Sequence, residues 1–180
     1  MTADAAALVF LDETGINTQM TPSYARAPKG QRAVGAVPHG SWHRLTVLGA
    51  LGSQGVLAAM SVEAATSAAV FLAFVEQVLI PALRRHRPDA LVVMDNLSAH
   101  KSPRVLAAFA QAGIAVRFLP RYSPDLSPIE PGWSKLKATL RAQEARDVDA
   151  LNQALGPALD AISPQDAQAW LRNCGYAILN

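Results

Sequence analysis

Apolar residues of this chain gather in short runs, which are separated by segments rich in glycine, proline and polar side chains. Runs of roughly four to eight residues bounded by such segments are typical of buried strands. Gly52 and Gly55 enclose a short turn that is typical of a hairpin. The pattern therefore predicts five strands, at residues 7–12, 45–51, 56–62, 91–95 and 114–119.

Longer stretches of the chain carry apolar residues at the spacing of a helix. Residues 66–86 show this spacing at Phe71 and Val75, among others. Ser102 and Gly113 are residue types that often begin and end a helix, and they enclose a second such stretch. Helices are therefore predicted at residues 66–86, 103–112, 129–142, 147–162 and 164–174, whereas residues 16–43 are predicted to be irregular.

The order of these elements indicates the fold class. A strand and a hairpin come first, and helices and strands then alternate before the final helices. A hairpin gives antiparallel strands, whereas a strand–helix–strand crossover gives parallel ones. The sequence therefore predicts an α/β fold in which a mixed β-sheet is flanked by helices. Functional sites in such folds gather at the carboxyl ends of the strands.

Three acidic residues stand at the boundaries of predicted elements. Asp12 closes the first predicted strand, Asp95 closes the fourth, and Glu130 opens a helix after a proline-rich loop. Carboxylates that converge on one point repel one another unless a cation lies between them. Hard divalent ions such as Mg²⁺ take oxygen ligands and often act on phosphate esters. The three acids therefore predict a metal-dependent phosphoryl-transfer site.

Each acid also has a simpler interpretation. Asp12 can be a solvated strand end, while a nucleotide-hydrolase motif is excluded because the chain contains no Gly-Lys pair to cradle a phosphate. A phosphatase with an aspartyl nucleophile is disfavoured, since Thr14 stands where a second aspartate is usual. Ser127 and Glu130 have the spacing of a helix capping box, which would explain Glu130 without chemistry.

Two polar residues after Asp95 are candidate auxiliary groups near the site. Asn96 is either a turn former or a site residue. His100 lies close enough in sequence to orient a phosphate or a water, although a histidine at such a position is more often structural.

Composition and charge narrow the class of protein. At 180 residues, with 51% hydrophobic and 17% charged residues, the chain is predicted to form one domain over residues 1–180. Its single cysteine excludes an intrachain disulfide, and no run is long enough to span a bilayer, so we expect a soluble, cytoplasmic protein without membrane contact. Residues 1–141 carry 14 Lys or Arg against 9 Asp or Glu, a balance that suits a polyanion such as DNA.

Several motifs together resemble the catalytic domain of DDE transposases of the mariner-type superfamily, specifically the six-thirty group of bacterial insertion sequences. The resemblance covers roughly residues 7–142, and 34 residues separate Asp95 from Glu130, as is usual in that superfamily. The matching residues are 11–15, 27–31, 94–96 with His100, and 119–130 with Trp133, Leu136 and Lys137.

The resemblance implies a ribonuclease-H-like fold with Asp12, Asp95 and Glu130 as the catalytic, metal-binding triad. It implies that two Mg²⁺ or Mn²⁺ ions support cleavage of double-stranded DNA at transposon ends and strand transfer into target DNA. A homodimer on DNA is the default expectation, because two transposon ends must meet. Candidate DNA-backbone contacts are Lys29, Arg32, Arg121, Lys135 and Lys137.

The chain departs from the family pattern in two ways. Ser127 replaces an asparagine that commonly precedes the Pro-Ile-Glu motif, and we expect little effect because both residues cap helices. The chain starts at the first catalytic strand, so the usual N-terminal helix-turn-helix region is expected to be absent. The chain is then either one half of a split reading frame, with the helix-turn-helix in a companion chain, or a truncated remnant. Two alternatives are a catalytically inactive transposase relic that binds DNA or assists assembly, and a cellular ribonuclease-H-like nuclease.

Overall fold

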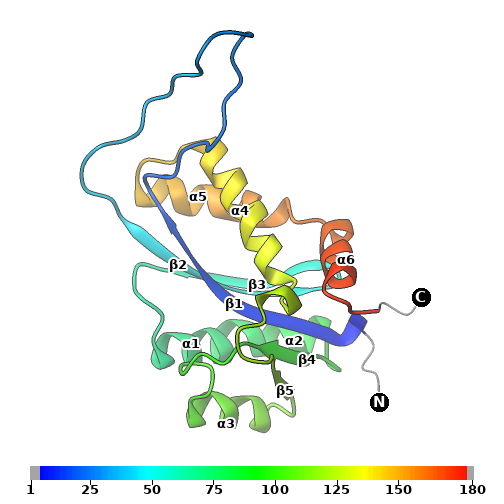
Figure 1. Ribbon diagram of the computed structural model, residues 1–180. Coiled ribbons are helices and arrows are strands. Elements are labelled where there is room, and N and C mark those ends of the chain that lie inside the picture. The colour runs from blue at the N-terminus through cyan, green and yellow to red at the C-terminus, as the bar shows by residue number, and fades with distance from the viewer. Residues whose placement is uncertain (1–4, 178–180) are drawn as a thin grey trace.

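The predicted strands pair into one five-stranded sheet in the computed structural model, which describes residues 5–177. The strand order is β3-β2-β1-β4-β5, with β1 in the centre (Figure 1). Strands β1, β2 and β3 pair antiparallel, whereas β1, β4 and β5 pair parallel, so the sheet is mixed as predicted. The strands are β1 (Leu8–Asn17), β2 (Arg44–Gly52), β3 (Gly55–Val62), β4 (Leu91–Met94) and β5 (Ala115–Phe118).

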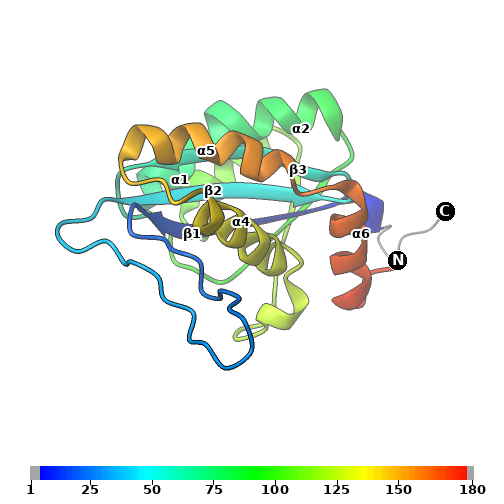
Figure 2. The same ribbon diagram turned by 90° about the horizontal axis from the view of Figure 1, so that it is seen from above.

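Helices cover both faces of the sheet (Figures 1 and 2). One face carries α1 (Ala68–Phe74), the π-helical turn η2 (Val75–Leu79), α2 (Ile80–His86) and α3 (Pro103–Gln111). The other face carries α4 (Ile129–Gln143), α5 (Val148–Asp160) and α6 (Pro164–Asn173). Short 3₁₀ helices occur at η1 (Ala5–Ala7) and η3 (Pro124–Leu126). Within residues 5–177, none of the helices is long and apolar enough to cross a bilayer.

The alternation of side chains along β1 divides the interior into two hydrophobic cores. Leu8 and Phe10 pack in the core beneath α4, α5 and α6. Val9 and Leu11 pack in the core beneath α1, α2 and α3. Successive side chains of a strand point to opposite faces, so both faces of β1 must be apolar over this stretch. The predicted α/β class, a mixed sheet flanked by helices, is confirmed.

The first strand extends further than its apolar run. It was predicted at residues 7–12, with Asp12 at its end, but β1 continues to Asn17. The parallel partner β4 stops at Met94, opposite Leu11, whereas β2 pairs with β1 as far as Arg44, opposite Asn17. The prediction for the end of β1 was therefore wrong, because the hairpin strand β2 supports residues that the apolar pattern does not mark.

The helix predicted at residues 66–86 contains a π-helical turn. In η2 the N–H of Ile80 donates to the carbonyl of Val75, five residues earlier. Pro81 follows directly and has no N–H to donate. The π-helical turn ends just before this proline. The elements α1, η2 and α2 follow one another without a break and form one continuous helical segment.

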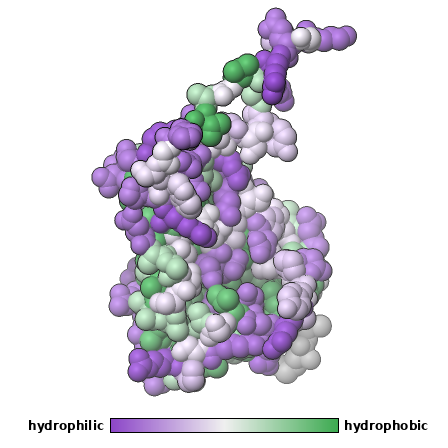
Figure 3. Space-filling model, turned by 60° about the vertical axis from the view of Figure 1, so that its left-hand side comes forward, coloured by the Kyte–Doolittle hydropathy of each residue, from purple (hydrophilic) through white to green (hydrophobic). Residues whose placement is uncertain are grey.

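Residues 18–43 form a long excursion between β1 and β2, here called the arm, and contain no helix or strand. The arm stands away from the body of the molecule (Figures 1 and 3). Its base is closed by a hydrogen bond from the N–H of Thr18 to the carbonyl of His43, and Gln19 donates to the carbonyl of Gly40. The side chain of Tyr24 is 93% exposed. The irregular segment was predicted at 16–43, and only its first two residues belong to β1 instead.

Candidate active site

The three predicted acids line one pocket. The pocket has a volume of about 440 Å³ and opens where β4 and β5 end and α4 begins. Asp12, Asp95 and Glu130 come from three different elements of the chain and share this cavity. The remaining wall is formed by Leu11, Asn96, Leu97, Ser127 and residues 119–124.

Asp12 and Asp95 are brought together by the parallel pairing of β1 with β4. Leu11 pairs with Met94, and each aspartate is the next residue along its own strand. Asp12 therefore does not end β1, but it does stand at the point where β1 loses β4 as a neighbour. Beyond this point β1 has no neighbour on its β4 side, so both carboxylates face the pocket at the carboxyl ends of the parallel strands, where functional sites are usual.

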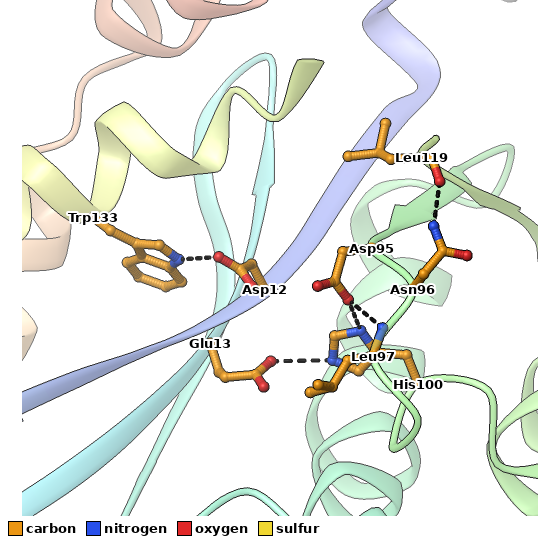
Figure 4. Close-up of polar contacts among 8 residues, drawn as sticks. All are labelled: Asp12, Glu13, Asp95, Asn96, Leu97, His100, Leu119 and Trp133. Carbon is orange, nitrogen blue, oxygen red and sulfur yellow. Dashed lines mark hydrogen bonds and ion pairs between the residues drawn. The ribbon is translucent and has the colours of Figure 1, made fainter. Parts of the chain in front are cut away.

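The Asp12 carboxylate is held by Trp133 of α4. Trp133 Nε1 donates a hydrogen bond to Asp12 Oδ2 over 3.0 Å (Figure 4). The indole ring can approach the sheet because Gly49, the β2 partner of Asp12, has no side chain, and a Cβ there would overlap the ring. The sequence pointed to Trp133 only as part of the family motif that contains Glu130, and it showed neither this donor role nor the need for Gly49.

Burial raises the pKa of Asp12 to about 7. The backbone N–H of Glu13 opposes this shift, whereas the negative charges of Glu130 and Glu13 add to it, and the Trp133 hydrogen bond again lowers the pKa. A half-buried carboxylate near other carboxylates is poorly stabilised in its charged form. A cation that prefers oxygen ligands would stabilise the charged carboxylates, so the oxygen ligands of Asp12, Asp95 and Glu130 fit a divalent metal ion.

Asp95 is exposed and directly follows β4. Its Oδ1 atom accepts a hydrogen bond from the N–H of Leu97 over 2.9 Å. Asn96, the next residue, donates from its side chain to the carbonyl of Leu119 and so ties this turn to the end of β5. Asn96 therefore both stabilises the turn after β4 and lines the pocket.

His100 is fully buried and does not line the pocket. Its Nε2 atom lies 3.1 Å from Glu13 Oε2, and its Nδ1 atom lies 2.6 Å from Asp95 Oδ1 (Figure 4). The second contact is a close ion pair rather than an aligned hydrogen bond. Burial lowers the pKa of His100, but the hydrogen bond and charge of Glu13, together with the charge of Asp95, raise it above its ordinary value overall.

Glu13 was not among the predicted site residues. The adjacent acids Asp12 and Glu13 lie on a strand, so the alternation of side chains sends Glu13 to the opposite face. There it contacts His100, while Asp12 contacts Trp133 (Figure 4). That alternation was the available signal for its separate role.

Glu130 is exposed at the start of α4 and faces the pocket. The capping-box alternative is wrong, since Pro128 rather than Ser127 is the N-cap of α4 and no side chain caps it. Nor do the three acids converge closely: within residues 5–177, no group of three His, Cys, Asp or Glu side chains is placed to hold a metal ion.

The predicted DNA-contact cations occupy different environments. Arg121 lines the pocket, whereas Lys29 and Arg32 are exposed on the arm. Lys137 is half-buried on α4. Lys135 instead forms an ion pair with Asp166 of α6, with Nζ 2.6 Å from Oδ2.

The family described as DDE superfamily endonuclease matches residues 7–152 of the chain. Among solved structures, the Mos1 transposase paired-end complex with left transposon end superposes with a TM-score of 0.78 at 20% identity, covering 94% of this chain and 52% of that one. The Mos1 mariner paired-end complex with Mn gives a TM-score of 0.73 at 19% identity, with coverages of 94% and 52%.

The catalytic domain of Mos1 mariner transposase gives a TM-score of 0.66 at 17% identity, covering 94% of this chain and 77% of that domain. These likenesses confirm the ribonuclease-H-like fold. The chain spans about half the length of the Mos1 chains in the two complexes. Among curated proteins, none matches this chain.

Proposed function

We propose that this chain, which belongs to the DDE superfamily endonuclease family, is the catalytic part of a transposase. It would cleave DNA strands at transposon ends and transfer them to target DNA. The observation that carries the proposal is the common pocket of Asp12, Asp95 and Glu130 on a ribonuclease-H-like sheet. The likeness to Mos1 complexes that contain transposon ends supports the same reaction.

Asp12, Asp95 and Glu130 would hold two Mg²⁺ or Mn²⁺ ions. Asp12 is half-buried, and burial together with the charge of Glu130 raises its pKa, which supports its role as a metal ligand. When bound, such ions supply Lewis acidity to both the attacking and leaving oxygens of an in-line displacement at a phosphodiester. Trp133 would keep the Asp12 carboxylate in place, because its N–H remains bonded to one oxygen.

We also propose that DNA lies across the mouth of the pocket and along the arm. Arg121 is at the pocket, Lys137 is on α4, and Lys29 and Arg32 are on the arm. Lys135 would reach a phosphate only by leaving Asp166. Contacts of this kind position a duplex without reading its sequence.

Recognition of transposon ends therefore requires a base-reading element in addition to these cations. We propose that a helix-turn-helix, in a companion chain, supplies it, and that the residues 1–180 act as one catalytic unit. Two ends must be held together for transposition, so the working form would be a homodimer on DNA.

A second candidate function is that of an inactive relic that binds DNA. One observation favours it: within residues 5–177, no three acidic, histidine or cysteine side chains are grouped closely enough to hold a metal ion. A cleavage assay separates the two functions, because a relic binds duplex DNA without nicking it.

The deciding experiment measures Mn²⁺-dependent nicking of an inverted-repeat duplex by the wild-type protein, Asp95→Asn and Asp89→Asn. Asp89 is an exposed aspartate just before β4 and serves as the matched control. We expect Asp95→Asn to abolish nicking without loss of the fold, since Asp95 is exposed, and Asp89→Asn to cleave normally. Equal nicking by all three proteins would contradict the triad, and preferential cleavage of an RNA–DNA hybrid would indicate a cellular nuclease.

A further inference from the structure

Glu13 is an acidic residue of the strand β1 that the three-acid site does not use. It neighbours Asp12 but points to the opposite face of the sheet, toward α1 and α3 (Figure 4). Its side chain is 18% exposed, which is unusual for a glutamate on a largely apolar strand. Burial of a carboxylate in this way requires a partner.

That partner is His100, which is fully buried. The imidazole stacks against Phe71 with ring centroids 4.2 Å apart, and no part of His100 is exposed. The ring also sits in a tight turn, in which the N–H of His100 donates to the carbonyl of Leu97. With Nε2 on Glu13, the opposite ring nitrogen can only face Asp95.

Asp95 is the member of the pocket that most needs such support. It is exposed and directly follows a four-residue strand, and the same Oδ1 atom also accepts a hydrogen bond from the N–H of Leu97. With Oδ1 held by Leu97 and His100, Oδ2 is left for the pocket. A buried ion pair contributes little net stability to a fold, so stability alone does not account for the row of Glu13, His100 and Asp95.

We propose that Glu13, acting through His100, is a positioning residue that fixes the Asp95 carboxylate in the orientation needed to bind a divalent cation. The inference rests on the proposed metal-dependent function. Outer partners that orient a metal ligand commonly contribute a factor of about 10 to 100 in metal affinity. Here the oriented ligand is the carboxylate, and the histidine is the link.

The test is Mn²⁺ binding to the purified full chain, measured from the electron paramagnetic resonance signal of free Mn²⁺. The proteins compared are wild type, Asp95→Asn, Glu13→Ala, Glu13→Gln and Glu63→Gln. Glu63 is the matched control, because it pairs with His43 over 3.0 Å but both side chains are more than half exposed. Circular dichroism melting establishes that each variant is folded.

We expect Asp95→Asn to lose Mn²⁺ binding and Glu13→Ala to bind about tenfold more weakly than wild type. Glu13→Gln should lose a smaller factor, roughly threefold, because its amide oxygen still accepts a hydrogen bond from Nε2. This partial rescue separates the hydrogen bond to His100, which Gln keeps, from the negative charge of Glu13, which Gln lacks. Glu63→Gln should bind as wild type does.

Folded Glu13→Ala with wild-type Mn²⁺ affinity, beside an Asp95→Asn variant that has lost binding, would overturn the positioning role and leave the proposed function intact. If Glu13→Ala does not fold, wild-type affinity in Glu13→Gln has the same meaning. Mn²⁺ binding that does not depend on Asp95 would overturn the proposed metal site, and the role of Glu13 with it.

Discussion

Asp12 is held in a position that favours its neutral form when no metal is bound. Burial and the nearby acids raise its folded-state pKa to about 7, whereas in the unfolded chain its pKa lies near the ordinary value of 3.8. A raised pKa means that this group stabilises the fold fully below about pH 4 and that the contribution is lost as pH rises toward 7.

Asp12→Asn should remove that loss, because the amide cannot ionise. In EDTA, the free energy of unfolding of the wild type should fall between pH 4 and pH 8 relative to that of the variant, by at most about 4 kcal/mol. Urea unfolding at several pH values measures the difference, with Asp89→Asn as the control. Parallel curves for wild type and Asp12→Asn would contradict the shift.

Gly49 is required by the close approach of Trp133. Gly49→Ala places a Cβ against the indole ring, and we expect a loss of about 1–3 kcal/mol together with displacement of the ring from Asp12. Gly156→Ala is the matched control, since it lies within α5 with open space around it, and it should stabilise by about 0.5–1 kcal/mol. Thermal melting measures whether each variant is less or more stable than the wild type. Unchanged stability of Gly49→Ala would show that the indole ring can move freely.

At the scale of the element, helices were predicted well where capping residues and the helical spacing of apolar residues indicate the same segment. A helix was predicted at residues 164–174, and α6 begins there with a full capping box, in which Asp166 accepts a hydrogen bond from the N–H of Ser163. The end of β1 was not predictable in this way, because the residues after Asp12 are held by pairing with β2, which is distant in sequence. The π-helical turn before Pro81 was also missed, since periodicity does not distinguish it from an α-helix.

Two serines at helix starts give a test of capping. Ser163 accepts a hydrogen bond from the N–H of Asp166, whereas Ser102 begins α3 without any side-chain cap. Ser163→Ala should lower the free energy of unfolding by about 1 kcal/mol, and Ser102→Ala should change it far less. Chemical denaturation of the two variants compares them directly, and equal losses would show that the capping bond of α6 is not the cause.

At the scale of the whole molecule, the three acids were found in the sequence because each stands at the boundary of a predicted element, but the residues that support them were not found. Glu13, Gly49 and the bond from Trp133 depend on which face a side chain occupies and on what lies across the sheet. Such contacts join residues more than 80 positions apart in all three cases. Local patterns contain no such information.

The distribution of charge over the molecule predicts how it holds DNA. Lys29→Ala combined with Arg32→Ala should make duplex binding less dependent on salt. The slope of the logarithm of the binding constant against the logarithm of the salt concentration should fall by about 1.8 in magnitude. The paired control is Arg84→Ala with Arg85→Ala, two exposed arginines at the end of α2. An unchanged slope in the arm variant would remove the arm from the DNA interface.

The arm also affects the resistance of the protein to proteolysis. Trypsin cleaves after lysine and arginine, and Arg26, Lys29 and Arg32 are all exposed in the arm. A nick there would separate β1 from the rest of the chain, yet β1 lies between β2 and β4 in the middle of the sheet. The two fragments would stay joined by the sheet's hydrogen bonds, so the protein can in principle be assembled from two separately made pieces.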